Sequence, residues 1–163
     1  MTLAELETEF HQLGQPKYRA RQVFGWLHRG TTSFAQMTNL SKPLREMLEE
    51  KYLIYNAEIE KKLESSLDET VKYLFRLYDG EYVESVLMRY HHGYSICIST
   101  QVGCRMGCTF CATGRGGFCR NLAPSEMLAQ IQAAERDKGI RISNIVLMGM
   151  GEPLDNFNNV VRF

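Results

Sequence analysis

A run of three cysteines, Cys104-Arg-Met-Gly-Cys108-Thr-Phe-Cys111, constrains the fold of this chain more than any other feature. It places three thiols within eight residues, so the chain must hold them together on one loop. Cysteine thiolates are the usual ligands of iron–sulfur clusters, which generally take four of them. With three cysteine ligands one iron stays open to a small molecule, and catalytic metal sites keep such an open position. The spacing therefore predicts a [4Fe–4S] cluster on Cys104, Cys108 and Cys111.

A structural zinc site is the alternative for these cysteines. It would need a fourth ligand, and the nearby candidates are His91, His92, Cys97 and Cys119. Zinc ligands more often come as two CxxC pairs, whereas this chain has one. The cluster is the favoured interpretation, and zinc stays open as the second.

The segments around the cysteines have the pattern of a strand–helix–strand unit. Residues 94–99 predict a strand that runs into the cysteine loop. Pro124 and Gly139 suit the first turn and the C-cap of a helix, with apolar residues at helical spacing between them. Residues 144–148 are a short apolar run, typical of a strand buried on both faces. Such units build parallel sheets and barrels, so this part predicts the start of a (β/α) barrel.

The residues before this unit divide into a helical part and a hairpin. Apolar residues at helical spacing predict three helices within residues 1–52, and Ser41 is the expected N-cap of the third. Residues 72–78 and 81–88 predict two strands joined by an Asp-Gly turn. The predicted class is α/β, with a helical domain, a β-hairpin segment and a partial barrel over residues 1–52, 53–92 and 93–163.

Composition and charge are those of an ordinary globular protein without a membrane anchor. The 163 residues are 44% hydrophobic and carry no formal net charge. No apolar run approaches the roughly 18 residues of a membrane helix, and the acidic start does not resemble a secretory signal. Five cysteines, three of them clustered, indicate metal binding in a reducing compartment. We therefore expect a cytoplasmic location and no membrane partner.

The charge is unevenly distributed near the N-terminus. Between His11 and Arg45 every charged side chain is basic, and aromatic residues are interleaved with them. Such a stretch is typical of an RNA-facing surface. A solvated helix face explains the same composition, and on the residues alone it is the favoured reading.

Three further positions are candidate site residues. Gly149-Met-Gly-Glu-Pro153 directly follows the second predicted strand, at the sheet edge where α/β folds bind ligands. Glu84 is the sole charge within residues 82–88, and Cys97 lies in the strand before the cysteines. A solvent-facing position for Glu84 and a small buried hydrophobe for Cys97 are the plain alternatives.

These motifs resemble those of a known family. The cysteine spacing, Phe110 before the last cysteine and the Gly-Glu-Pro motif resemble radical S-adenosylmethionine (SAM) enzymes. Over most of its length the chain resembles the radical SAM adenine C2-methyltransferases of 23S ribosomal RNA, whose bacterial members also methylate transfer RNA. The matching segments are Arg21–Trp26, Ser33–Lys42, Lys72–Phe75, Asp79-Gly80, Val83–Val86, Cys97–Cys104, Gly117-Phe118, Arg120–Leu122 and Met148–Leu154.

The resemblance implies roles for individual residues. The three clustered cysteines would hold the cluster, and Gly151 and Glu152 would contact SAM. Glu84 would accept a proton at the target adenine, and Cys97 would take part in a transient disulfide during turnover. The N-terminal helices would form an RNA-binding domain, which raises the RNA interpretation of the basic stretch above the solvated face.

The resemblance also implies a methyl-cysteine mechanism. Adenine C2 is electron-poor, so the family first moves a methyl group from SAM to a cysteine, and a radical formed on that group adds to C2. No residue of this sequence matches the methyl-carrying cysteine, and the remaining barrel strands are absent. We interpret the chain as an N-terminal portion, and expect it to bind a cluster poorly and to be inactive alone.

The expected partners follow from the same resemblance. They are 23S rRNA and tRNA as substrates and an electron donor for the cluster, with the protein acting as a monomer. A zinc-stabilised RNA-binding module without catalysis and a truncated, inactive gene product stay open as other interpretations. Relatives that methylate C8 of the same adenine keep the position of methylation open as well.

Overall fold

The computed structural model describes residues 1–163, which divide into two compact units. One unit spans Met1–Asn56 and the other Ala57–Phe163. Each unit is described by itself. The functional domain limits expected after residues 52 and 92 stay a prediction.

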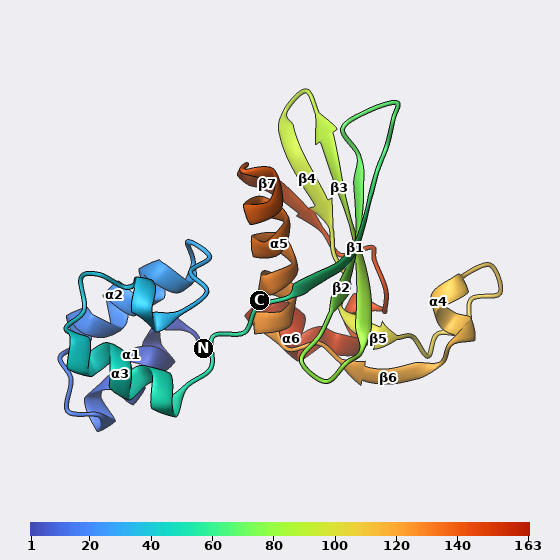
Figure 1. The fold of residues 1–163 in the computed structure, drawn as a ribbon. Helices are drawn as coiled ribbons and strands as arrows, with labels where there is room; N and C mark the ends of the chain where they lie inside the picture. The colour runs from blue at the N-terminus through green and yellow to red at the C-terminus, as the bar shows by residue number, and fades with distance from the viewer. The chain divides into compact units, whose positions relative to one another are not determined.

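The N-terminal unit is helical, as predicted. It contains α1 (Leu3–Gln12), α2 (Lys17–Leu27), the short 3-10 helix η1 (Phe34–Gln36) and α3 (Lys42–Lys51) (Figure 1). Thr2 and Glu5 form a capping box at α1, since each side chain accepts a hydrogen bond from the other residue's backbone N–H. Ser41 precedes α3 as expected, but its side chain makes no capping hydrogen bond.

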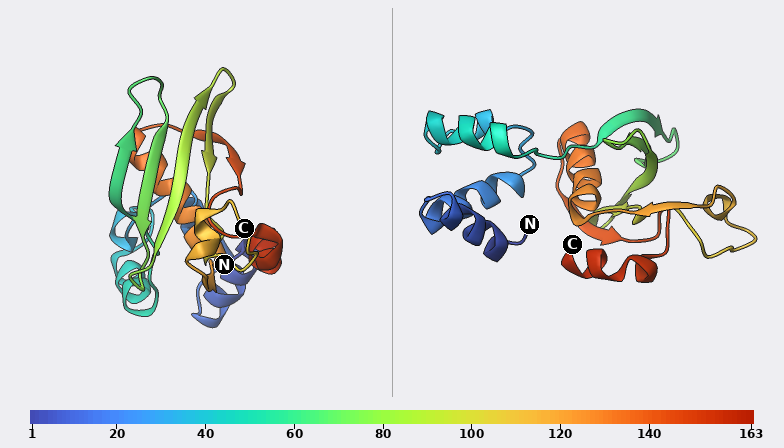
Figure 2. Two further views of the ribbon diagram at one scale, coloured as in Figure 1. Left: turned by 90° about the vertical axis from the view of Figure 1, so that its right-hand side faces the viewer. Right: turned by 90° about the horizontal axis from the view of Figure 1, so that it is seen from below.

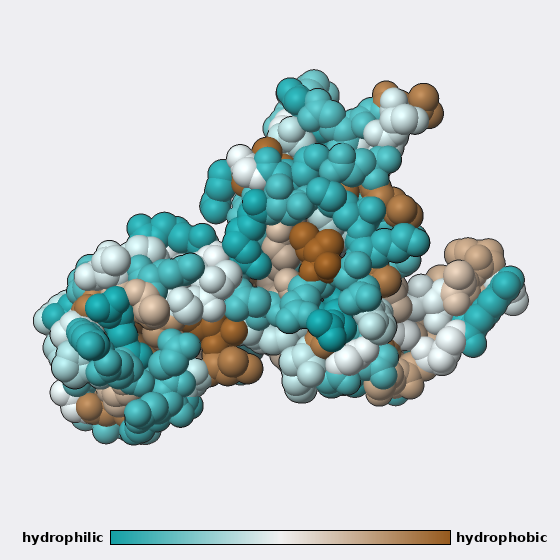
Figure 3. Space-filling model, viewed as in Figure 1, coloured by the Kyte–Doolittle hydropathy of each residue, from teal (hydrophilic) through white to brown (hydrophobic).

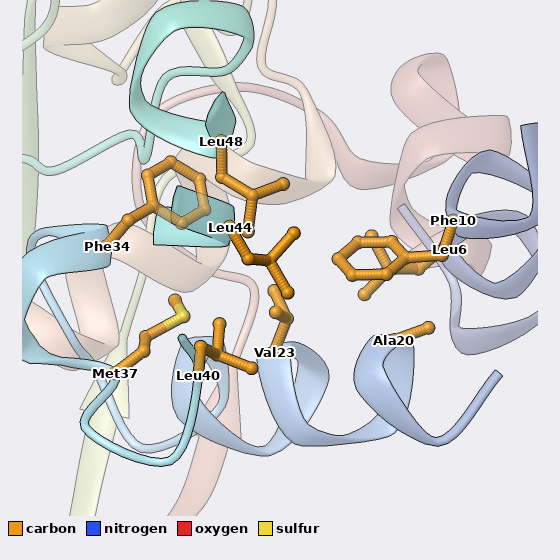
Figure 4. Packing of buried hydrophobic residues seen from close by; sticks show 9 residues of the cluster. All are labelled: Leu6, Phe10, Ala20, Val23, Phe34, Met37, Leu40, Leu44 and Leu48. Carbon is orange, nitrogen blue, oxygen red and sulfur yellow. The ribbon is translucent and has the colours of Figure 1, made fainter. Parts of the chain in front are cut away.

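One apolar cluster holds these helices together. Its buried members are Leu6, Phe10, Ala20, Val23, Phe34, Met37, Leu40, Leu44 and Leu48 (Figure 4). Full burial of a side chain such as Phe10 or Met37 stabilises the fold by about 1.5–3 kcal/mol. The cluster draws on all three α-helices and η1, so the apolar stripe of each helix marks its core side.

The C-terminal unit is built on a five-stranded sheet. Its strands, in spatial order, are β1 (Glu58–Glu64), β2 (Val71–Arg76), β3 (Tyr82–Tyr90), β4 (Gly93–Cys97) and β7 (Ile142–Val146). Neighbours from β1 to β4 are antiparallel, whereas β4 and β7 are parallel. The helix α5 (Pro124–Lys138) connects that parallel pair and lies against one face of the sheet (Figures 1 and 2). The predicted α/β class and the βαβ unit are confirmed.

A second, two-stranded sheet carries the cysteines. It pairs β5 (Gln101–Gly103) with β6 (Phe118–Asn121), and the connection between them contains α4 (Ala112–Arg115). Figure 1 shows this connection projecting beyond β5 and β6. After β7 the chain enters the 3-10 helix η2 (Pro153–Asn156) and then α6 (Phe157–Arg162).

The predicted hairpin is confirmed, with β2 and β3 on either side of the Asp79-Gly80 turn. Gly80 has a φ of +85°, a backbone conformation that glycine adopts without steric cost. In the register of the two strands, Leu74 pairs with Glu84 and Tyr73 with Ser85. Side chains therefore alternate between the two faces of the sheet.

The face that carries Tyr73 and Ser85 is the one covered by α5. The Tyr73 hydroxyl donates to Asp137 of α5 at 2.8 Å, and the Ser85 hydroxyl donates to Gln130 of the same helix at 2.8 Å. Burial and the neighbouring Asp137 carboxylate raise the pKa of Tyr73. Glu84 lies on the opposite face, which α5 leaves uncovered.

The expectation that the second predicted strand is buried on both faces is wrong. β7 is exposed along most of its length, and Ile145 and Val146 are 46% and 37% exposed. The physical reason is its place at the edge of the sheet, where β4 is its one partner. The apolar residues of β7 are nevertheless typical of a parallel strand that has a neighbour on each side.

The surface is mainly hydrophilic in the view of Figure 3, and apolar side chains form small separate patches. None of the helices has the length and apolar character that a membrane-crossing segment needs. Among the exposed apolar side chains, Met106 and Phe110 lie between the cysteines, and Phe110 is 88% exposed.

Arg120 joins three parts of the C-terminal unit. Its guanidinium donates two hydrogen bonds to the Glu126 carboxylate, at 2.9 and 2.8 Å, and one to Asp79 at 2.6 Å. The Glu126 side chain is 4% exposed and also accepts the Ala123 N–H at the start of α5. The hydrogen bond from Arg120 lowers the pKa of Asp79. β6, the start of α5 and the hairpin turn are thereby held together.

Replacing this arginine should destabilise the fold. Arg120→Met leaves the Glu126 carboxylate buried without its partner, so we expect the free energy of unfolding to fall by about 3 kcal/mol. The control is Arg115→Met, which removes an exposed arginine of α4 and should change stability by less than about 0.5 kcal/mol. Denaturant unfolding followed by circular dichroism measures both. Equal stability of the two variants would contradict the role of Arg120.

Candidate functional site

The chain between β4 and the cysteines is polar and fully buried. Ser99, Thr100 and Gln101, here called the strand-end segment, are at most 1% exposed. A buried polar group without a hydrogen-bond partner costs about 1–3 kcal/mol. Neighbouring elements supply partners to the backbone of this segment and to the Ser99 and Gln101 side chains, whereas the buried Thr100 hydroxyl has no hydrogen-bond partner.

Gln130 of α5 binds the backbone of Ser99 on both sides. Its side-chain oxygen accepts the Ser99 N–H at 3.0 Å, and its side-chain nitrogen donates to the Ser99 carbonyl at 3.0 Å. The same oxygen accepts the Ser85 hydroxyl of β3. One buried amide thus fixes the end of β4 against α5 and β3.

The strand-end segment also holds residues 149–152, here called the glycine loop. The Ser99 hydroxyl accepts the Met150 N–H at 2.9 Å and donates to the Glu84 carbonyl at 2.6 Å. In return, the Met150 carbonyl accepts the N–H groups of Thr100 and Gln101 at 2.9 and 3.2 Å. The glycine loop is therefore paired with the chain that leads into the cysteines.

Two glycines make this close pairing possible. A Cβ on Gly149 would lie 2.7 Å from the Ile98 carbonyl carbon and oxygen. A Cβ on Gly151 would lie 2.6 Å from the Gln101 Cβ, and Gly151 also has a φ of +99°. Both positions require the absence of a side chain, so the two glycines permit the close approach of the glycine loop to Ile98 and Gln101.

The next element is the cysteine loop, residues 104–111. Its base is closed by a hydrogen bond from the Cys104 N–H to the Gly117 carbonyl at 2.9 Å, and Gly103 contacts Gly117 so closely that a Cβ would lie 2.0 Å from that carbonyl oxygen. Cys104 and Cys111 are partly exposed and Cys108 is exposed. Hydrogen bonds from the backbone N–H groups of residues 114 and 113 lower the pKa of Cys111.

The side chains of the loop suit an iron–sulfur cluster by their chemistry. All five cysteines of the chain are free thiols, and soft thiolates are the ligands that such clusters take. No three of its histidine, cysteine, aspartate and glutamate side chains are gathered in a metal-holding arrangement. Neither the three clustered cysteines nor the alternative zinc ligands, which would add His91, His92, Cys97 or Cys119, are therefore arranged around a metal position.

Glu84 and Cys97 lie on the same face of the sheet, the one that α5 leaves uncovered. Cys97 pairs with Val86 in the register of β3 and β4, so its side chain shares the face of Val86 and of Glu84 two residues before it. The Lys72 ammonium lies 2.8 Å from the Glu84 carboxylate, and both side chains are nearly half exposed. Burial raises the pKa of Cys97 and outweighs a hydrogen bond from the Met148 backbone that lowers it.

Glu152 begins η2. Its carboxylate accepts the N–H of Leu154 at 3.0 Å, which caps this short helix. Its own N–H donates to the side-chain oxygen of Gln101 at 2.9 Å. The backbone around Gly151 and Glu152 is thus fixed from both sides.

The polar residues that connect these parts could not be recognised from the sequence pattern. Gln101, Arg105, Gln130 and Asp155 were not singled out, because each partner lies far away in the sequence. Gln101 lies within Cys97–Cys104, one of the segments that carry the family resemblance, and this was the one indication of its importance. Cys119 is exposed on β6 and has no assigned role.

Two family profiles match separate parts of the chain. The ribosomal RNA large subunit methyltransferase N-terminal domain matches residues 1–54, and the radical SAM superfamily matches residues 98–163. The second match begins at the end of β4 and contains the strand-end segment, the cysteine loop and the glycine loop.

Similar proteins cover the whole chain. A protein of Alkaliphilus oremlandii named "Probable dual-specificity RNA methyltransferase RlmN" is 53% identical over 163 residues, which are 100% of this chain and 48% of that protein. A protein of the same name from Lachnoclostridium phytofermentans is 52% identical over 164 residues, covering 100% of this chain and 46% of that protein. The chain is thus similar over its whole length to these relatives, and the two family models match separate parts of it. It spans about half the length of the curated relatives it matches.

A solved structure has the same fold. A radical SAM methyltransferase from Sphaerobacter thermophilus superposes with a TM-score of 0.91 at 43% identity, over 99% of this chain and 49% of that one. The likeness confirms the resemblance read from the motifs and the expected fold class with a partial radical SAM barrel.

The burial of Cys97 predicts how its thiol reacts. Iodoacetamide attacks thiolates, so the raised pKa of Cys97 should keep its labelling slow at neutral pH, and the rate should rise steadily from about pH 7 to pH 10. The exposed Cys119 should be labelled faster than Cys97 at neutral pH. Mass spectrometry of tryptic peptides, after timed labelling of the reduced chain, measures both rates. Equal rates at neutral pH would contradict the account of Cys97.

Proposed function

We propose that the chain provides the cluster site, part of the SAM site and the RNA-binding domain of a radical SAM methyltransferase that acts on C2 of an adenine in 23S rRNA and tRNA. The observation that carries the proposal is the strand-end segment, which links the cysteine loop and the glycine loop at one end of β4. Its support from relatives is the 53% identity to a protein named as a dual-specificity RNA methyltransferase.

In this proposal Cys104, Cys108 and Cys111 hold a [4Fe–4S] cluster, which when bound and reduced supplies the electron that splits SAM. The glycine loop binds SAM, with Gly151 giving the close backbone approach and Glu152 facing the amino group. One Glu152 oxygen is used in capping η2, so the carboxylate is held in a fixed direction rather than left mobile. A fixed donor or acceptor loses less entropy when a ligand binds.

Glu84 is the proposed proton acceptor at the adenine. It lies on the uncovered face of the sheet, where Lys72 orients its carboxylate. Cys97 lies on the same face in the neighbouring strand. Burial raises the pKa of Cys97, so its thiolate would form only when a base takes its proton. That thiolate would then attack the sulfur of the methyl-carrying cysteine, so that a disulfide forms, the bond between that sulfur and the RNA-bound carbon breaks, and the carbon takes the electron pair and a proton. No residue of this sequence matches the methyl-carrying cysteine, which would be the second partner in that disulfide.

The N-terminal unit is the proposed RNA-binding domain. Arg19 lies over the Tyr18 ring at 4.9 Å and Arg29 over the Trp26 ring at 4.8 Å, and Tyr18 is 54% exposed. Guanidinium groups bind phosphates and aromatic rings stack with bases, so such pairs suit RNA. We further propose an external electron donor, action as a monomer and a cytoplasmic location.

Metal analysis tests the proposal. After anaerobic reconstitution with an excess of iron and sulfide, which compensates for the weak cluster binding expected of this chain alone, we expect iron and sulfide in equal amounts, approaching about four of each per chain. Cys104→Ala, Cys108→Ala and Cys111→Ala should each lose most of this iron, whereas the control Cys119→Ala should keep it. Zinc in place of iron, or iron that survives all three substitutions, would contradict the cluster and favour the zinc-stabilised RNA-binding module.

A further inference from the structure

Three side chains connect the cysteine loop to the glycine loop. They are Gln101 of the strand-end segment, Asp155 of η2 and Arg105 of the cysteine loop. None of them is among the residues proposed above for the cluster, SAM or RNA.

Gln101 is the buried centre of this network. Its side-chain oxygen accepts the Glu152 N–H at 2.9 Å, and its side-chain nitrogen donates to Asn121 and to Asp155, both at 2.8 Å. A side-chain amide has two N–H donors, and both are used here. Turning the amide over would set its NH₂ against the Glu152 N–H and its oxygen against the Asp155 carboxylate. The network therefore allows Gln101 one orientation.

Asp155 passes the connection to the cysteine loop. One of its carboxylate oxygens accepts the Gln101 side chain at 2.8 Å, and the same oxygen forms an ion pair with Arg105, whose Nε lies 3.0 Å away. Arg105 follows Cys104 directly, and its guanidinium lies 4.0 Å from the centre of the Phe118 ring. Arg105 is thus held from two sides, by a carboxylate and by an aromatic face.

The energy of such a pair is modest, so its main effect is on position. The Arg105 side chain is 52% exposed and that of Asp155 is 24% exposed, and exposed ion pairs typically contribute about 0–1 kcal/mol to stability. Gly151 packs directly on the Gln101 side chain. A shift of Arg105 would therefore reach Glu152 and Gly151 through two hydrogen-bonded side chains.

We propose that Gln101, Asp155 and Arg105 are positioning residues that set the place of the SAM-binding glycine loop relative to the cysteine loop. The inference rests on the proposed function for the identity of the ligand. The network itself consists of contacts within the chain and can be tested without cluster or SAM.

Hydrogen exchange on the chain without metal tests the connection. Arg105→Met should speed amide exchange in the cysteine loop and also in residues 149–155, by up to about fivefold, because the ion-pair partner of Asp155 is lost. Asp155→Asn should produce the same pattern, and the double variant should exchange no faster than either single variant. The matched control is Arg115→Met, which removes a charge from the same connection and should leave both segments unchanged. Faster exchange confined to the cysteine loop, in both variants, would overturn the proposal.

SAM titration of the reconstituted chain tests the positioning role. By electron paramagnetic resonance (EPR), Arg105→Met should keep the iron and sulfide content but require about tenfold more SAM for the same spectral change. Arg105→Lys keeps a cation opposite Asp155 and should restore most of the response. A response equal to wild type in Arg105→Met would overturn the positioning role, whereas a wild-type chain without cluster would contradict the proposed function and leave the exchange experiment to decide on the network.

Discussion

Burial of a polar strand end is the constraint on which the C-terminal unit depends. Ser99, Thr100 and Gln101 leave the sheet after β4 with backbone and side-chain groups that water cannot reach. Each of these groups would cost about 1–3 kcal/mol if left unpaired. The partners come from α5 through Gln130, from the glycine loop, and from η2 through Asn156, whose side chain donates to the Thr100 and Leu122 carbonyls at 2.8 and 2.9 Å. Pairing the polar groups of one short segment, all but the Thr100 hydroxyl, thus places several distant parts of the chain.

The same constraint explains why the candidate chemistry lies where it does. Ligands of α/β folds bind beyond the carboxyl ends of parallel strands, and β4 with β7 is the one parallel pair here. The strand-end segment follows β4 and leads through β5 into the cysteine loop, and the glycine loop follows β7, so both loops are reached from that edge. Gly149 and Gly151 then allow backbone contact with Ile98 and Gln101 that no side chain would permit.

Local pattern was sufficient to locate several of the longer elements and the cysteine loop. Helical spacing located the three N-terminal helices, the Asp79-Gly80 turn located the hairpin, and thiol spacing located the cysteine loop. β1 was missed because all seven of its residues are exposed and it carries no apolar alternation. The exposure of β7 was missed because its apolar residues are typical of a strand buried between two neighbours, whereas β7 pairs with β4 alone. Long-range polar partners such as Gln130 and Asp155 leave no periodic signal at all.

The most direct test of the account is whether SAM binds at the cluster held by the cysteine loop. Electron–nuclear double resonance on the reduced, reconstituted chain, with SAM labelled with ¹⁵N in its amino group, reports contact between that nitrogen and the cluster iron. The account predicts a resolved ¹⁵N coupling that disappears when unlabelled SAM replaces the labelled compound. A normal cluster signal without any ¹⁵N coupling would contradict it, because the glycine loop would then not present SAM to the cysteine loop.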